Sequence, residues 1–600
     1  MSTRMLRSQV PAELTWNLAD LFADKAAWEK EQAAVDADVT TVTKYKGRLG
    51  ESAGVLLACL EAQEALSIRL TRVMTYASLR LSEDGSDSEK QSDMERFSSV
   101  MARIQAVLSF IDSEILALPD GTIEGYLAKE KGLADFRKYL SELAERKPHQ
   151  LSAETERLLA ALGPVFGAPY TIYSRAKSSD MAFAPVVDST GQEHPMSLAL
   201  YEDHYEELPN TELRHKAYAS FVDTLKHYQN TFAAGYSAEV RRQVTMAKER
   251  GYESATHMLL QPQQVTLDMY HRQLDIIQTE LAPHMRRLAK VNQRVLGLPK
   301  MRHCDLKVPL DTEFVPKTTI AEAGQVIIDA LSVLGPDYRK VVESALANRW
   351  VDFADNVGKS TGAFCSSPYG VHPYILVTWT DTMRGAFVLA HELGHAGHFS
   401  FAQRHQRIGN TRPSMYFIEA PSTMNELLLA QHLFANTQDP RMRRWIAMQS
   451  LGTYYHNFVT HLLEGALQRR VYALAEAGNA ITAKVLCEQK GEVLESFWGD
   501  AVEIDDGARL TWMRQPHYYM GLYPYTYSAG LTISTAAALN IREQGQPAVD
   551  RWLQALSAGG TLRPLDLIAL AGVDMSTADP IRKAVAYVGS LVDEVEKGFA

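Results

Sequence analysis

The chain has 600 residues, of which 46% are hydrophobic and 22% charged, as in an ordinary globular protein long enough to form two or more lobes. Its net charge of −11, with no offsetting basic cluster, argues against nucleic acid as a partner. No stretch reaches the roughly 18 apolar residues that cross a membrane, and the first residues lack the apolar segment of a signal peptide. Four widely spaced cysteines without a metal-binding pair spacing favour a reduced protein, so we expect a cytoplasmic location.

Most of the chain is predicted to be helical, because apolar residues recur at intervals of three and four with charged faces between them. The clearest such segments are residues 53–80, 91–117, 211–250, 265–297 and 320–347. Residues 182–196 read instead as two short strands around a turn, and 304–318 as a connector that contains two prolines. We expect a mainly α protein with a helical N-terminal lobe over residues 1–200 and a second region over 201–600.

A short strand is predicted over residues 373–380, a run of β-branched and aromatic side chains. Asp381 and Thr382, which follow it, are suited to cap the start of a helix. An edge strand can pair with an extended peptide. Tyr374, Leu376 and Thr378 are therefore candidate substrate-binding residues.

The helix that follows this strand carries the pattern His-Glu-Leu-Gly-His at residues 391–395. His391 and His395, four positions apart, lie on one face of a helix and can reach a single zinc ion. Glu392 lies one step round the helix, where its carboxylate can hold a water bound to the metal and accept its proton. The alternative for this pentapeptide alone is a pair of ordinary core or surface histidines.

A catalytic zinc ion needs a third protein ligand and one open position for water. His398 follows His395 by three residues and points to a different part of the helix, so we expect it to support a ligand or to pack. Glu419 and Glu426 lie seven residues apart on one face of a later helix, where one could bind zinc while the other supports a ligand histidine. The spacing does not choose between these two glutamates.

The His-Glu-Leu-Gly-His pattern, followed after 23 intervening residues by Glu-Ala-Pro-Ser, resembles the thimet-type zinc oligopeptidases, most closely the oligoendopeptidase F branch. The resemblance implies that His391, His395 and Glu419 bind one zinc ion per chain, with Glu392 as the general base. Glu426 then takes the supporting role. Weaker similarities extend over nearly the whole chain, and they imply that residues 115–185 form the N-terminal domain typical of this branch.

Residues 512–530 extend the resemblance, because the family places a histidine and tyrosines from such a segment across the cleft from the metal. Neutral donors of this kind stabilise the negative charge that builds up on a carbonyl oxygen during hydrolysis. His517 matches the histidine, and Tyr523, Tyr525 and Tyr527 match the alternating tyrosines of the oligoendopeptidase F branch. Which tyrosine donates is left open, and without the resemblance the segment is interpreted as an aromatic core cluster.

The resemblance implies a large, two-lobed, multi-helix metallopeptidase with a deep central substrate channel and a small antiparallel β element beside the zinc helix. Its expected substrates are short unstructured peptides, which it cuts at internal bonds; no membrane partner is expected, and no feature indicates an oligomeric state. One alternative is a helical zinc carboxypeptidase. The other is a non-catalytic peptide-binding protein, against which an intact Glu392 argues.

Overall fold

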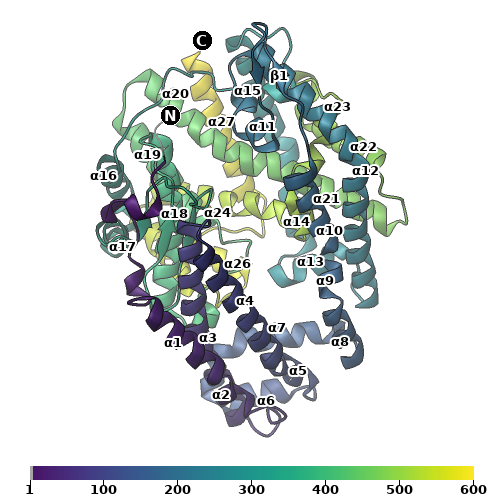
Figure 1. Cartoon of the computed structure of the whole chain (residues 1–600), viewed down its shortest axis with the longest axis vertical. Helices are drawn as coiled ribbons and strands as arrows, with labels where there is room; N and C mark the ends of the chain where they lie inside the picture. Colours follow the sequence, from purple (N-terminus) through teal and green to yellow (C-terminus); the bar gives the residue numbers. More distant parts are fainter. Residues whose placement is uncertain (1–3, 600) are drawn as a thin grey trace.

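The computed structural model describes residues 4–599, and most of these residues lie in α-helices (Figure 1). This confirms the prediction of a mainly α fold. Helix starts follow from local sequence, because side chains such as Ser52 and Asn210 accept hydrogen bonds from backbone N–H groups of the first turn. Within the described residues, no helix combines the length and apolarity that a bilayer crossing requires.

Most of the N-terminal helices lie toward the lower end of the molecule in Figure 1, and the last of them rise along its right side. They are α1 (Lys25–Ala37), α2 (Thr40–Thr43), α3 (Ala53–Glu83), α4 (Ser88–Leu108), α5 (Phe110–Ala117), α6 (Thr122–Lys129) and α7 (Arg137–Arg146), followed by α8 (Ala153–Ala161), α9 (Gly163–Phe166) and α10 (Ala168–Arg175). Helices α1 to α7 enclose an apolar core of their own that includes Trp28, Phe97 and Leu140. A second, larger core runs from Tyr173 to Val595. The division at residue 200 stays a prediction, because a packing cluster is not by itself a domain.

The middle of the chain contains a β-ribbon and several long helices. The predicted ribbon is present as the antiparallel strands β1 (Val186–Val187) and β2 (Glu193–His194). The helices are α11 (Leu198–Asp203), α12 (Thr211–Glu249), α13 (Ala255–Leu260), α14 (Leu267–Ile276), α15 (Ala282–Val295), α16 (Ile320–Leu331) and α17 (Pro336–Ala347). The segment predicted as one helix over 320–347 is divided in two, because Gly335 adopts a positive φ of 91° and Pro336 starts a new helix.

A three-stranded sheet lies between α17 and the next helix in the sequence. It consists of β3 (Val351–Asp352), β4 (Phe364–Ser366) and β5 (Tyr374–Leu376), in the order β3-β5-β4, with β3 parallel and β4 antiparallel to β5. The prediction that β5 is an edge strand is therefore wrong. Its two partner strands are too short to show a strand pattern in the sequence. Strand β4 forms one edge of the sheet and β3 the other.

The candidate substrate-binding residues do not face a peptide through β5. Tyr374 and Leu376 are fully buried and pack with Trp16 and Leu79. Thr378 lies beyond the end of the strand and is half-buried. Because both hydrogen-bonding edges of β5 are occupied, an extended chain cannot pair with it.

The remaining helices form the centre of the larger core. They are α18 (Met383–His405), α19 (Ala420–Asn436), α20 (Pro440–Tyr454), α21 (His461–Glu476), α22 (Ala483–Trp498), α23 (Asp506–Arg509), α24 (Pro524–Gln544), α25 (Gln546–Ala558), α26 (Pro564–Leu570) and α27 (Asp579–Gly598). A π-helical turn, η13 (Tyr455–Thr460), joins α20 to α21. Helix α19 packs against both α18 and α24.

Two glycines allow α19 to approach its neighbours closely. A Cβ atom on Gly394 of α18 would lie 2.4 Å from the carbonyl oxygen of Pro421 and 2.6 Å from Cα of Ser422. A Cβ atom on Gly530 of α24 would lie 2.9 Å from Cβ of Glu419. All three distances are shorter than real Cβ contacts, so only glycine permits this spacing of the three helices.

We expect Gly394→Ala to push α18 and α19 apart and to lower stability by about 1–3 kcal/mol, as overpacking does in a close-packed core. The change is measured as a fall in the midpoint of thermal unfolding. Gly452→Ala in α20 is the matched control, because its added methyl group meets nothing within 4 Å. We expect the control to keep or raise the midpoint, since alanine favours a helix. Equal midpoints for the two variants would contradict this packing argument.

Candidate metal centre

His391 and His395 lie one turn apart on α18, and their ring centroids are 5.2 Å apart. Helix α18 begins after Thr382, whose hydroxyl accepts a hydrogen bond from the Gly385 N–H. The local sequence therefore starts the helix where predicted, and the helical repeat then brings both imidazoles to one face.

Glu419 meets these two imidazoles from the start of α19. Its Oε2 atom lies 3.5 Å from His391 Nε2 and 3.4 Å from His395 Nε2, and it accepts a hydrogen bond of 3.0 Å from the Ser422 hydroxyl. One donor atom of each residue lies within 4.8 Å of the other two. Two imidazole nitrogens and a carboxylate oxygen are a donor set typical of catalytic zinc, and all three side chains are partly exposed, which leaves one side open for water. The residues present thus fit a metal ion.

Glu426 contacts the ring nitrogen of His391 that points away from Glu419. The ring nitrogen Nδ1 of His391 lies 2.7 Å from Glu426 Oε1, and the Thr453 hydroxyl donates to Glu426 Oε2 at 2.9 Å. Burial disfavours the imidazolium, but hydrogen bonds to Glu419 and Glu426 outweigh it and raise the pKa of His391 well above its ordinary value. Since Nδ1 is engaged with Glu426, Nε2 is the nitrogen directed at the cluster.

Glu392 is only 6% exposed, yet its carboxylate makes no hydrogen bond with another described residue. Burial raises the pKa of Glu392, while the imidazoles of His391 and His395 act in the opposite direction. A carboxylate with a raised pKa that lies beside a metal-binding cluster is suited to exchange protons near neutral pH.

His398 does not join the cluster. It is fully buried, neither ring nitrogen has a hydrogen-bond partner among the described residues, and burial lowers its pKa to about 3. Its ring stacks on Phe399 and meets the ring of Phe417 edge-on. Of the two roles expected for His398, the contacts are those of a packing residue, and it supports no ligand by hydrogen bonding to a described residue.

His517 and two of the three candidate tyrosines form a second group. The ring centroid of His517 lies 5.4 Å from that of Tyr523 and 5.7 Å from that of Tyr527, and the two tyrosines are 5.0 Å apart. Tyr525 is fully buried on another side of α24 and donates to Gln263 Oε1 at 2.6 Å. The alternating pattern is misleading because the segment is helical, and in a helix positions four apart share a face.

Tyr527 connects this group to the metal-binding cluster. It lies one turn before Gly530, where α24 touches Glu419. Burial raises the pKa of Tyr527, with Tyr523 and the carboxylates of Glu419 and Glu464 adding to the shift. The Tyr527 hydroxyl therefore lies in the field of both carboxylates, between the cluster and α21.

The sequence analysis missed three residues beside His517. His461 Nδ1 lies 2.8 Å from Glu464 Oε2, His461 Nε2 lies 3.1 Å from His456 Nε2, and the His461 ring stacks on Tyr527 at 4.3 Å. Nδ1 of His517 lies 3.9 Å from Glu464 Oε2, too far for a hydrogen bond. The signal available in the sequence was the spacing of His461 and Glu464, which puts an imidazole and a carboxylate on one helix face.

Among the described residues, two other groups of side chains have metal-ligand types within reach of one another. They are His461, Glu464 and His517, and His215, Cys304 and Asp305. In the latter group, Asp305 Oδ1 already accepts from Arg214 Nε at 2.9 Å and Nη2 at 2.7 Å. A guanidinium at this position competes with a cation, so this group is a poor candidate for metal binding.

Comparison with known proteins identifies the families and the proteins to which this chain is similar. The model of peptidase family M3 matches residues 204–587, and a model described as oligopeptidase F matches residues 114–183. The chain is 30% identical to oligopeptidase PepF of Bacillus subtilis, over 98% of this chain and 88% of that protein. It is 26% identical to group B oligopeptidase PepB of Streptococcus agalactiae, over 98% of both chains.

Solved structures share the fold. A protein from Chlamydophila abortus superposes with a TM-score of 0.90 at 24% identity, over 99% of this chain and 100% of that chain. The oligoendopeptidase-F of Enterococcus faecium superposes with a TM-score of 0.73 at 24% identity, over 95% of this chain and 98% of that chain. The helical architecture is thus common to these proteins over nearly their whole lengths.

We expect Glu426→Gln to weaken zinc binding about 10- to 100-fold, because it removes the charged acceptor that orients His391. The affinity is measured by competition with a chromophoric chelator. Glu464→Gln, in the neighbouring candidate group, serves as the control and should leave the affinity unchanged. If zinc affinity falls in Glu464→Gln but not in Glu426→Gln, the metal binds at the His461 group instead.

Proposed function

Because the chain belongs to peptidase family M3, we propose that this metallopeptidase is a zinc-dependent endopeptidase that cuts internal bonds of short, unstructured peptides. One observation carries the proposal: Nε2 of His391, Nε2 of His395 and Oε2 of Glu419 converge, with Glu392 beside them. The names of the similar proteins from Bacillus subtilis and Enterococcus faecium, an oligopeptidase and an oligoendopeptidase, support the substrate class.

His391, His395 and Glu419 are the residues that would hold the zinc ion, one per chain. The chemistry that zinc supplies when bound is polarisation of the scissile carbonyl and a fall in the pKa of a bound water to about 7. Glu392 accepts a proton from the attacking water and passes it to the leaving amine. The burial that raises the pKa of Glu392 favours this exchange, since it brings the carboxyl closer to neutral pH.

His517, Tyr523 and Tyr527 are the proposed donors to the oxyanion that forms on the former carbonyl. Neutral imidazole N–H and phenol O–H groups stabilise such charge without a compensating counter-ion. Nδ1 of His517 is buried and has no hydrogen-bond partner among the described residues, and the proposal takes Nε2 as the donor. His461 supports this side by stacking on Tyr527, and Glu464 orients His461.

The peptide is proposed to pair with β4, the edge of the sheet, in place of β5. Strand β4 packs against α18, so a chain beside it runs along the metal helix. We further propose a deep channel between a lobe over residues 1–200 and a catalytic region over 201–600 as the route that admits short peptides. A cytoplasmic location is part of the same proposal.

The decisive experiment uses peptides of graded length that are blocked at both ends, with products identified by mass spectrometry. We expect internal cuts that stop above a limiting length. Glu392→Gln should keep its zinc, because Glu392 is not a ligand, and should lose about 100- to 10,000-fold in rate. Blocked peptides left whole by the zinc-loaded protein would favour the carboxypeptidase alternative. Binding without any cleavage would favour a peptide-binding protein.

The tyrosines are separated by substitutions that remove only a hydroxyl group. We expect Tyr523→Phe or Tyr527→Phe to lower kcat about 100- to 1000-fold with little change in KM, as loss of an oxyanion donor does. Tyr525→Phe makes the same chemical change away from the cluster and should keep kcat near that of the native enzyme. His517→Ala should lose as much as the more severe tyrosine variant. A comparable loss in Tyr525→Phe would show that hydroxyl removal acts through structure.

A further inference from the structure

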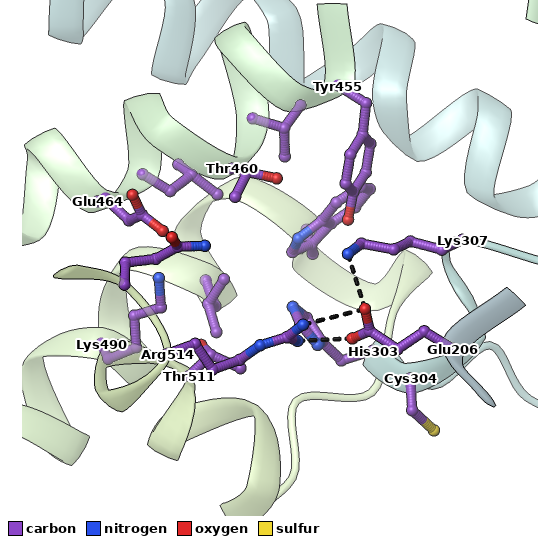
Figure 2. Close-up of a pocket in the computed structure, with 15 residues that line it drawn as sticks. Glu206, His303, Cys304, Lys307, Tyr455, Thr460, Glu464, Lys490, Thr511 and Arg514 are labelled. Carbon is purple, nitrogen blue, oxygen red and sulfur yellow. Dashed lines mark hydrogen bonds and ion pairs between the residues drawn. The ribbon is translucent and has the colours of Figure 1, made fainter. Parts of the chain in front are cut away.

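A small cavity that opens to solvent lies next to the proposed catalytic side chains (Figure 2). Its wall is formed by side chains of α21, α22, the π-helical turn η13 and the segments around Glu206, His303 and Arg514. Glu464, which bonds to His461, is part of this wall. The cavity is thus separate from the metal-binding cluster, with the His461 group between them.

Most charges in the wall compensate one another. Arg514 Nη1 lies 2.5 Å from Glu206 Oε1, and Arg514 Nε lies 2.8 Å from Glu202 Oε1. Lys307 Nζ lies 2.7 Å from Glu206 Oε2. Figure 2 shows the ion pairs of Glu206 with Arg514 and Lys307 on one side of the cavity, with Lys490 and Glu464 on the other.

Lys490 is the exception. It is 4% exposed, and within residues 4–599 its ammonium group has no hydrogen-bond acceptor and no carboxylate oxygen within 4 Å. Burial lowers the pKa of Lys490 to about 8, so the group is still charged at neutral pH. Its countercharge is the carboxylate of Glu464 in the same wall, which acts on the ammonium from beyond hydrogen-bond distance. The N–H groups of Lys490 therefore have no direct acceptor among the described residues, and an anion in the cavity supplies one.

Two uncharged donors face the same space. The hydroxyl groups of Tyr455 and Thr460 make no hydrogen bond with other described residues, and Figure 2 shows both directed into the cavity. Both residues belong to η13, a π-helical turn of six residues. Such turns occur preferentially at functional sites, where they redirect side chains out of a regular helix.

We propose that this cavity binds a small oxyanion of the carboxylate or phosphate class, with Lys490 as the cation and Tyr455 and Thr460 as hydroxyl donors. The oxyanion is either the carboxylate of a peptide or a free inorganic anion. Its binding does not depend on the proposed peptidase reaction; only the peptide source rests on that function. Since Glu464 bonds to His461 and His461 stacks on Tyr527, an anion here lies two side chains from a proposed oxyanion donor.

Equilibrium dialysis of the zinc-loaded protein with radiolabelled phosphate, at constant ionic strength, tests the site directly. We expect Lys490→Met to weaken phosphate binding at least about 10-fold, the loss of one charge-assisted hydrogen bond. Lys484→Met is the matched control, because Lys484 lies on the same helix with its side chain 84% exposed, and it should bind as the native protein does. Phosphate held elsewhere is common to all three proteins and cancels in the comparison.

The source of the oxyanion is tested with one peptide that carries either a free carboxylate or an amide at its C-terminus. If the peptide supplies the carboxylate, the native enzyme should favour the free acid in kcat/KM by about 10-fold, and Lys490→Met should abolish that preference. If a free anion is the occupant, Lys490→Met weakens phosphate binding but leaves the acid-to-amide ratio unchanged.

The proposal is overturned if Lys490→Met changes neither phosphate binding nor the acid-to-amide ratio, or if Lys484→Met weakens binding equally. Should Lys490→Met fail to fold, the double variant Tyr455→Phe/Thr460→Val takes its place. It should weaken phosphate binding several-fold, and unchanged binding would overturn the proposal. If phosphate does not bind, the peptide-cleavage assay still tests the proposed peptidase function. If peptides are not cleaved, equilibrium dialysis still tests phosphate binding, so the two proposals are tested separately.

Discussion

The site depends on how closely α19 approaches α18 on one side and α24 on the other. Each contact is made at a glycine, Gly394 or Gly530, where even a single added methyl group would collide with the backbone or Cβ of α19. Glu419 stands at the start of α19, so the first contact sets its distance to the imidazoles of α18. The second sets its distance to the tyrosines of α24. Backbone packing, more than any one polar bond, thus fixes the relative positions of the metal-binding and oxyanion-stabilising groups.

Polar contacts then orient the side chains that packing has brought together. Glu426 engages one nitrogen of His391 and leaves the other for the cluster. On the opposite side, Glu464 engages His461, whose ring stacks on Tyr527. His391 is thus held by a carboxylate from a neighbouring helix, and Tyr527 packs on an imidazole that a carboxylate of its own helix engages. Such contacts reduce the freedom that a reactive side chain would otherwise lose on binding substrate.

Much of this could be predicted from the sequence, where the geometry is local. A helical repeat is enough to place His391 and His395 together, and the same logic would have found His461 and Glu464. Spacing could not choose Glu419 over Glu426, because that choice depends on where α19 packs; the family resemblance made it. Likewise, the alternation of tyrosines matched the family but gave no indication that the helix turns Tyr525 away from the cluster.

The sheet and the cavity were beyond sequence reasoning for a similar reason. Strand β5 is central because two strands of two and three residues pair with it, and segments so short carry no detectable alternation. The cavity around Lys490 draws its wall from five separate parts of the chain. Only their tertiary arrangement shows that this lysine, unlike Lys307, makes no direct ion pair with a carboxylate of the described residues.

Anomalous diffraction from crystals of the purified protein at the zinc absorption edge tests the central claim most directly, because it locates the metal without reference to activity. The account predicts one strong peak per chain, bounded by His391 Nε2, His395 Nε2 and a carboxylate oxygen of Glu419. A peak among His461, Glu464 and His517 instead, or no peak in protein crystallised with zinc, would contradict it.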